Sequence, residues 1–158
     1  MVIKQLYVAV CMVTLVVVSA ACTNINIYER TEYFPTHTWA DSVKPSFTFN
    51  ITDTTQPYNL YIVLRHTDAY HFNNMWVNVT TKAPQGKPET QMLELPLATN
   101  ANGWLAKGMD DIFEHRIRIN QYPVNLKLGT YQFTLQHTMR ENPLTNVLNA
   151  GIRVERLQ

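Results

Sequence analysis

The amino-acid sequence predicts an all-β protein: a single antiparallel β-sandwich, Greek-key or jelly-roll-like, that follows a cleaved signal peptide. Three observations predict this class. Segments in which apolar and polar residues alternate recur along the chain, turn-forming segments separate them, and residues 22–158 carry no long helical pattern. We divide the chain into a lipoprotein signal peptide (1–21), a lipidated N-terminus with a short tether (22–33) and a β-sandwich domain (34–158).

The first 21 residues have the three parts of a secretory signal. Lys4 supplies a positive charge, and the run from Leu6 to Val18 is almost entirely apolar. This run is about 13 residues long, whereas a helix needs roughly 20 to cross the hydrocarbon core of a bilayer. The small residues Ser19 to Ala21 then form a cleavage site. We therefore expect this segment to be removed.

Cys22 is the predicted lipid attachment point, because Ser19-Ala20-Ala21-Cys22 resembles the lipobox of bacterial lipoproteins. The other cysteine, Cys11, lies in the segment to be discarded, so the mature chain keeps one thiol. An unpaired thiol is unusual in a secreted protein, and a thioether bond to lipid accounts for it. Two or three acyl chains, palmitate among them, then hold the chain firmly to a membrane. The alternative is an ordinary secreted protein with a free Cys22.

The mature chain begins with a polar stretch in which a first strand is expected near Asn26. "SFTFNI" then indicates a half-buried strand and "YNLYIVLRH" a fully buried one, and "MWVNVTT", "ETQMLEL", "HRIRIN", "TYQFTLQHTM" and "GIRVERL" continue the pattern. Turn chemistry separates them in "TDTTQP", "APQGKPE", "NANG" and "ENPLTN". The segment 109–112 allows a short helical turn. The expected core comprises Phe47, Phe49, Leu60, Ile62, Leu64, Val77, Phe133, Leu135, Ile152 and Val154.

Three stretches together resemble the GldH family of gliding-motility lipoproteins from Bacteroidetes. They are "DTTQPYNLYIVLRHTDAYHFNNMWVNV", "NGWLAKGMDDI" and "GTYQFTLQHTMRENPLTNVLNAGIRVERL", joined by the lipobox and by Tyr28-Glu29. The resemblance implies an outer-membrane lipoprotein that is needed for gliding and is tied to the type IX secretion apparatus in gliding relatives. It brings no enzymatic activity and no cofactor. We expect a non-catalytic protein that acts through contacts with envelope proteins of the motility or secretion apparatus.

Charge argues against nucleic-acid and nucleotide partners. The chain has 13 Lys and Arg against 12 Asp and Glu, and removal of Lys4 leaves 12 of each. No basic stretch and no glycine-rich phosphate loop is present in the sequence. A neutral mature chain without such motifs therefore predicts partners of another kind.

Two clusters offer metal-ligating side chains, and neither predicts a metal site. The carboxylates and imidazole of "GMDDIFEH" match no known ligand spacing, so we interpret Asp110, Asp111, Glu114 and His115 as a solvated loop. His66 and His71 flank "TDAY", where a surface turn is the simpler interpretation. No serine of the mature chain lies in a nucleophile elbow, and no carboxylate pair is nominated for catalysis.

Four residues form the candidate interaction surface: Arg65, Trp76, Trp104 and Arg140. Arg65 ends an apolar strand and Arg140 follows another, so each is placed to anchor a protein partner. Trp39, Trp76 and Trp104 are also suited to line a sugar-binding face, as aromatic residues do in lectin-like jelly rolls. A carbohydrate-binding outer-membrane lipoprotein with such a face is therefore the alternative function. Packing of the tryptophans in the core remains open as well.

The residues after Cys22 bear on the side of the membrane. Surface-exported lipoproteins of this phylum tend to carry acidic residues there, and Thr23 to Ile27 include none. We therefore expect the periplasmic face of the outer membrane.

Overall fold

The structure is a computed structural model that describes residues 27–157. Every regular element in this range is a β-strand, and no helix within it is long and apolar enough to cross a membrane. The strands are β1 (Ile27–Tyr33), β2 (Thr38–Trp39), β3 (Ser46–Ile51), β4 (Tyr58–Thr67), β5 (Asn74–Lys82), β6 (Glu89–Pro96), β7 (Ala98–Thr99), β8 (Gly103–Trp104), β9 (Lys107–Met109), β10 (Ile112–Arg118), β11 (Gly129–His137), β12 (Leu144–Thr145) and β13 (Val147–Arg156).

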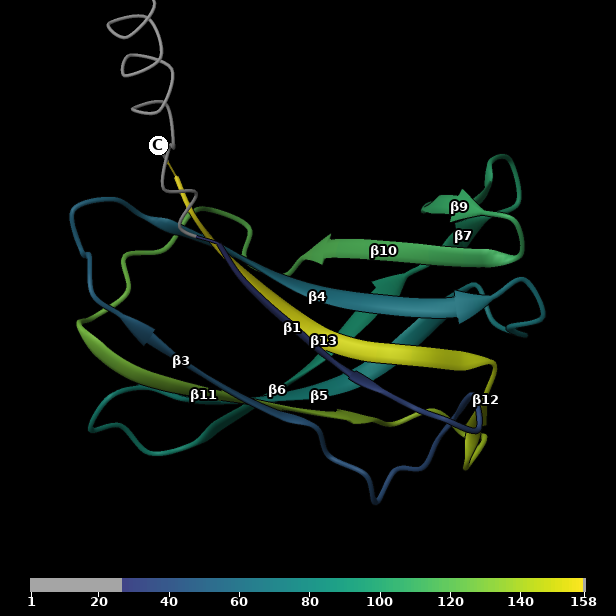
Figure 1. Ribbon diagram of the computed structural model, residues 1–158, viewed down its shortest axis with the longest axis horizontal. Helices are drawn as coiled ribbons and strands as arrows, with labels where there is room; N and C mark the ends of the chain where they lie inside the picture. Colours follow the sequence, from purple (N-terminus) through teal and green to yellow (C-terminus); the bar gives the residue numbers. More distant parts are fainter. Residues whose placement is uncertain (1–26, 158) are drawn as a thin grey trace, which may run out of the picture.

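Two sheets form a sandwich (Figure 1). The five-stranded sheet has the order β1-β13-β4-β10-β9 and the four-stranded sheet the order β3-β11-β5-β6, with antiparallel neighbours throughout. Two small ladders, β2 with β12 and β7 with β8, complete the secondary structure of the described residues. The predicted antiparallel β-sandwich is confirmed.

The core lies between the two sheets, where alternate residues of each strand point inward. Strand β3 shows this most simply, because Phe47, Phe49 and Ile51 are buried and the residues between them are exposed. Phe49 stacks on Tyr131 with ring centroids 5.6 Å apart. Nine of the ten predicted core residues are buried, and Leu60 is half-buried against the same cluster.

Residues 27–33 belong to the sandwich. Strand β1 begins where a first strand was expected and pairs with β13 along its whole length, from Ile27 with Glu155 to Tyr33 with Asn149. The sheet therefore includes residues that the sequence-based division assigns to the tether. Cys22 and the predicted signal peptide lie outside the described residues.

The helical turn allowed at residues 109–112 is wrong. Met109 ends β9, Ile112 begins β10, and the two residues pair across a two-residue hairpin loop. Asp110 in this loop has a φ of 56°. Tight hairpins need such a left-handed residue, and Asp tolerates it better than most side chains do. The Asp-Asp pair is thus turn chemistry within a β-hairpin.

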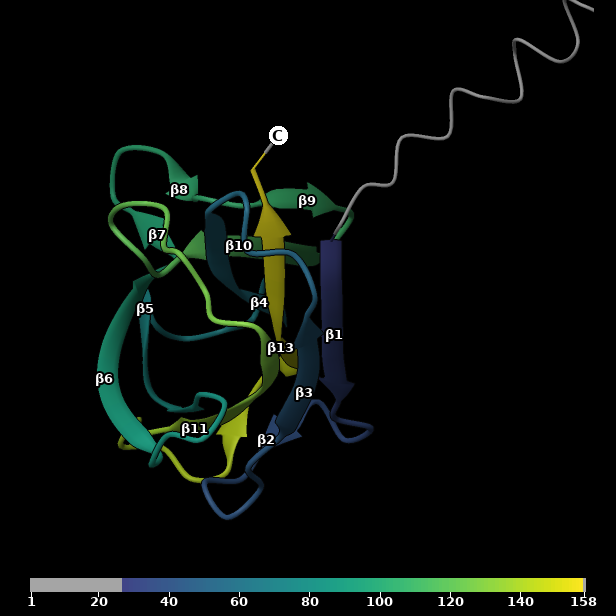
Figure 2. The same ribbon diagram turned by 90° about the vertical axis from the view of Figure 1, so that its left-hand side faces the viewer.

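The sandwich has two ends, which differ in what they expose. The proximal end holds the start of β1, the end of β13, the turn 83–88 and the segment 119–128 (Figure 1). The distal end holds the end of β1, the loop 68–73 and the residues from β7 to β9. Figure 2 looks onto the proximal end.

Candidate interaction face

The outer face of the five-stranded sheet is built from residues that the ladder register places in rows. Arg116 on β10 lies beside Val63 on β4, Val63 beside Gly151 on β13, and Gly151 beside Thr31 on β1. The two middle residues of this row are small. The long side chain of Arg116 can therefore extend over them toward the far edge of the sheet.

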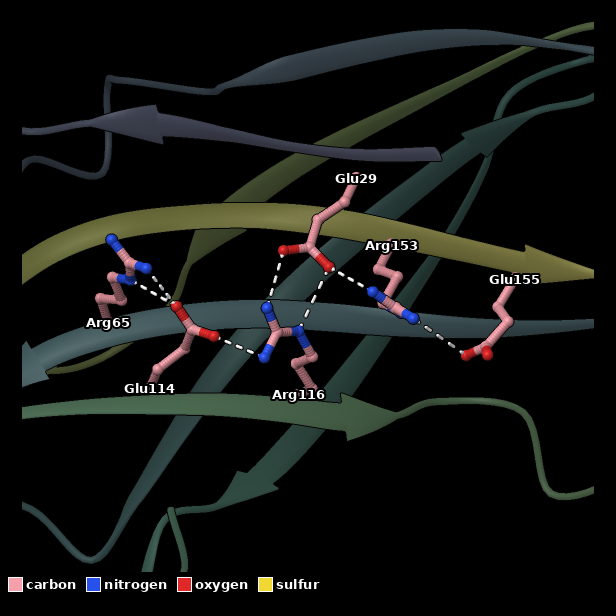
Figure 3. Close-up of polar contacts among 6 residues, drawn as sticks. All are labelled: Glu29, Arg65, Glu114, Arg116, Arg153 and Glu155. Atoms are coloured by element: carbon pink, nitrogen blue, oxygen red, sulfur yellow. Dashed lines mark hydrogen bonds and ion pairs between the residues drawn. The ribbon is translucent and has the colours of Figure 1, made fainter. Parts of the chain in front are cut away.

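An ion-pair network crosses this face (Figure 3). Glu29 on β1 accepts hydrogen bonds from Nη2 of Arg116 at 3.0 Å and from Nη1 of Arg153 at 2.8 Å. Glu114 accepts from Arg65 at 2.5 Å and also pairs with Arg116 at 2.5 Å. Arg116 thus joins the two carboxylates, and through them the network links β1, β13, β4 and β10.

Charge pairing shifts the pKa values within the network in the direction that preserves it. The hydrogen bond from Arg116, and then that from Arg153, lower the pKa of Glu29, although partial burial opposes them. The hydrogen bond to Glu29 raises the pKa of Arg116 and of Arg153. Exposed pairs of this kind contribute about 0.2–1 kcal/mol each, because water screens them. Their main effect is to hold the side chains in place.

Val63 shows how closely the charged side chains cover the sheet. It points outward, beside Arg116, and yet only 1% of its surface is exposed. Long charged side chains can bury their methylene stems on apolar surface while their charged ends remain in water. The centre of this face is therefore a packed and ordered surface.

A hollow of about 430 Å³ adjoins the network at the distal end of the face. Its lining includes Arg65 and Glu114 on one side and the β9–β10 hairpin, with Met109 and Ile112, on the other. Met109 is 80% exposed and Ile112 39%, so the apolar side chains of the hairpin are open to solvent. The lining also includes Lys107, Asp110 and Asp111, so the hollow joins charged side chains of both signs to an exposed apolar pair. This combination suits contact with another protein.

A buried histidine pair lies beneath the distal end of this face. The Nε2 atoms of His66 and His115 are 2.9 Å apart, and Nδ1 of His66 lies 2.8 Å from the carbonyl oxygen of Thr67. A carbonyl only accepts, so Nδ1 of His66 donates to it, and Nε2 of His66 then accepts from His115. Burial lowers the pKa of both rings, that of His115 to about 4 with a further contribution from His66. Both rings are therefore neutral at pH 7.

The two histidine interpretations made from the sequence need correction. His66 is fully buried within β4 and is not part of a surface turn, because the alternation of the strand turns it inward with Leu64. His71 is exposed, as expected. In "GMDDIFEH", only the two aspartates occupy a solvated turn, since Glu114 and His115 lie in β10 and His115 is buried. No group of three or more His, Cys, Asp or Glu suited to a metal occurs among residues 27–157.

The four residues of the predicted interaction surface do not share one face. Arg65 points outward from the five-stranded sheet, whereas Trp104 lies at the distal end against His66, whose side chain points inward, and donates from Nε1 to Asp68 at 2.8 Å. Trp76 points outward from the opposite, four-stranded sheet, where its neighbours Met75 and Val77 fill the core. Arg140 is exposed in the loop after β11. A single flat partner cannot cover both Arg65 and Trp76.

Sequence reasoning missed Glu29, Arg116, Arg153 and the exposed Met109. A signal was present in "HRIRIN" and "GIRV", where Arg116, Arg118 and Arg153 alternate with apolar residues and so lie on the outward face of their strands. That signal places the arginines on a surface without naming the carboxylate that they bind.

The model of a family described as GldH lipoprotein matches residues 26–154. The chain is similar to a protein named gliding motility lipoprotein GldH homolog from Christiangramia forsetii, at 26% identity over 89% of this chain and 90% of that protein. It is also similar to the gliding motility lipoprotein GldH of Flavobacterium johnsoniae, at 26% identity over 74% of this chain and 77% of that protein.

One solved structure also gives a weak match. The VP2 subviral particle of infectious bursal disease virus matches with a TM-score of 0.39 and 13% identity, over 85% of this chain and a third (33%) of that one. A likeness of this degree says nothing about function. The family model, by contrast, covers nearly all of the described sandwich, and the chain therefore belongs to the GldH lipoprotein family.

Proposed function

We propose that this chain is a non-catalytic lipoprotein of the outer membrane, anchored through Cys22, which serves gliding motility by binding proteins of the motility and type IX secretion apparatus. The observation that carries the proposal is the distal hollow, where the exposed side chains of Met109 and Ile112 adjoin Arg65 and its ion-pair network. The names of the two relatives, both gliding motility lipoproteins, support a role in gliding motility.

The chemistry of the distal hollow favours a protein partner. Methionine and arginine are enriched in protein interfaces, and a flexible methionine fills an irregular apolar pocket well. Arg65 is held against Glu114, so less side-chain entropy is lost when a partner binds than for a free arginine. The hairpin itself is constrained by Gly108, on which the ring of Phe113 packs so closely that a Cβ atom would lie 2.8 Å from it. The surface is therefore preorganised.

The lipid anchor strengthens the binding of a partner in the same membrane. A chain that is neutral after cleavage exerts little long-range electrostatic attraction on a partner, so association depends on shape and apolar contact. Anchoring both molecules to one membrane raises their effective concentration. The absence of acidic residues from Thr23 to Ile27 supports the periplasmic leaflet.

Crosslinking in cells of the source bacterium tests this function. A photoreactive residue placed beside the hollow, at Lys107, is expected to capture one or a few envelope proteins reproducibly. Met109→Asp should abolish the capture, because it puts a charge on the apolar rim. Met92→Asp is the matched control, since Met92 is also exposed (60%) but lies on β6 in the other sheet. Equal capture by both variants would show that this corner is not the binding site.

The competing carbohydrate function predicts a different outcome. The three tryptophans lie in three environments: Trp39 is buried in the core, Trp104 packs at the distal end and Trp76 lies on the outer face of β5. They do not line one sugar-binding face. A glycan array with the mature protein is therefore expected to be blank. Tight binding of a glycan that is lost in Trp76→Ala, with no protein captured in cells, would assign the carbohydrate function instead.

Two further measurements test the anchor and its side. A clickable fatty acid should label the wild type and not Cys22→Ala; label that persists on the variant would exclude Cys22 as the attachment point. Protease added to intact cells should leave the domain uncut if it faces the periplasm. Removal of the domain by that treatment would place it on the cell surface.

A further inference from the structure

We propose that the proximal end of the sandwich rests on the bilayer as a membrane-contact surface, with Tyr122 and Leu128 inserted among the phospholipid head groups. The inference rests on the proposed attachment of lipid at Cys22. Both side chains belong to the segment 119–128 and are among the most exposed large apolar side chains of the described residues, at 72% and 67%.

Their exposure is imposed by a well-anchored segment. The backbone N–H of Tyr58 donates to the carbonyl of Val124 at 2.8 Å, and that of Val124 donates back at 2.9 Å. The side chain of Asn120 accepts from the N–H of Leu60 and donates to the carbonyl of Tyr58. The backbone N–H of Lys127 donates to the hydroxyl of Tyr131 at 2.9 Å. These bonds fix the segment to the strands while Tyr122 and Leu128 remain in solvent.

The position of this segment follows from where the chain enters the domain. Tyr58 pairs with Arg156, and the neighbouring Glu155 pairs with Ile27, so the segment lies at the end of the sandwich from which β1 starts (Figure 2). Cys22 precedes Ile27 by five residues, which span at most about 18 Å when fully extended. A lipid on Cys22 therefore keeps this end, and not the distal one, at the membrane.

The residues around the two side chains suit a phospholipid surface. Tyrosine is enriched at the interface of membranes, where its ring lies at head-group level, and leucine gains by leaving water. Lys87 and Lys127 line a hollow of about 500 Å³ beside Leu128, and Glu89 is the only acidic residue in that lining. Lysines near an anionic surface are attracted to it. The surroundings of Leu128 thus combine an exposed apolar side chain with two lysines against one glutamate.

Site-specific quenching tests the proposal on the lipidated protein purified from membranes. Cys22 is blocked by its thioether and Cys11 is removed with the signal peptide, so a new cysteine is the single reactive thiol. Leu128→Cys carries a fluorescent probe at the proximal end, and Asn100→Cys carries it in an exposed distal turn as the matched control. The protein is reconstituted into vesicles of phosphatidylethanolamine and phosphatidylglycerol that contain a phospholipid with a nitroxide on its head group.

We expect the probe at residue 128 to be quenched at least twofold more strongly than the probe at residue 100. Equal quenching on protein that floats with the vesicles would overturn the contact surface and leave the anchor intact. Protein that stays off the vesicles would overturn both the anchor and the surface. As a second measurement, Tyr122→Ser in the Leu128→Cys background should reduce the quenching; unchanged quenching in that variant would remove Tyr122 from the contact.

Discussion

Acid should destabilise this protein through its buried histidine pair, and His115 allows the effect to be calculated. Only 2% of His115 is exposed, and burial, with the neighbouring His66, lowers the pKa of its ring to about 4, against 6.5 in the unfolded chain. The unfolded state therefore binds more protons than the folded state between these two values. The stabilising contribution is complete above pH 6.5 and is lost as the pH falls toward 4.

The magnitude follows from linkage. A difference of one pKa unit corresponds to about 1.4 kcal/mol, so lowering the pH from 7 to 4.5 should remove about 2.5 kcal/mol through His115 alone. His66 and His137, whose pKa values are also lowered by burial, act in the same direction. A loss of this size is a large fraction of the 5–15 kcal/mol that stabilises a typical domain.

Urea unfolding of wild type and His115→Gln at a series of pH values isolates the effect. Glutamine keeps an N–H that can donate to Nε2 of His66 and removes the ionisable ring, so the variant should lose about 2.5 kcal/mol less than wild type between pH 7 and 4.5. His71→Gln is the control for the same substitution at an exposed site: the ring is not buried and contacts the carboxylate of Glu141 at 3.9 Å, so this variant should not show the smaller loss. Parallel pH profiles for wild type and His115→Gln would refute the reasoning.

Three further substitutions test the packing and the charged face. Gly151→Ala should lower the free energy of unfolding by more than about 2 kcal/mol in urea, because its Cβ would lie 2.1 Å from the carbonyl oxygen of Arg30. Gly86→Ala is the control and should be nearly neutral, because its Cβ has no neighbour closer than 3.4 Å. Similar losses in both variants would contradict the steric argument. Leu64→Ala should cost about 2–5 kcal/mol in the same assay, and a loss below 1 kcal/mol would mean that the core collapses around the gap. Glu29→Gln should cost about 1 kcal/mol at pH 7. Since the pKa of Glu29 is lowered in the folded state, the difference from wild type should shrink as the pH falls below about 4.5; a pH-independent difference would argue against the ion pairs.

The strands and the core could be predicted from the sequence because the alternation of apolar and polar residues within each strand shows which of its side chains are buried. In "SFTFNI" the period of two identifies Phe47, Phe49 and Ile51 as one inward face, and the structure confirms it. The same period in "YNLYIVLRH" continues from Ile62 and Leu64 to His66, and it contained the information that His66 is buried. The surface-turn interpretation gave more weight to the polarity of histidine than to its place in the alternation.

The ion-pair network could not be predicted in this way. Alternation tells which side chains of one strand share a face, but it does not tell which strands are neighbours. Glu29 and Arg153 are 124 positions apart in the sequence, and Glu29 and Arg116 are 87 apart. They meet because β13 returns between β1 and β4, which is a property of the topology. The hollow beside Met109 likewise depends on how the β9–β10 hairpin folds back.

Under the proposed attachment of lipid at Cys22, the pairing of β1 with β13 has a mechanical consequence. A force that a partner applies at the distal end, while the membrane holds the proximal end, acts along the axis of β1. Backbone hydrogen bonds between antiparallel strands lie perpendicular to that axis, so the seven residue pairs of this ladder share the load in shear and do not open one after another. The ladder would open one pair at a time only if Ile27 and Glu155, which pair at the same end, were pulled away from each other. Attachment at Cys22 would therefore load β1 in shear against β13.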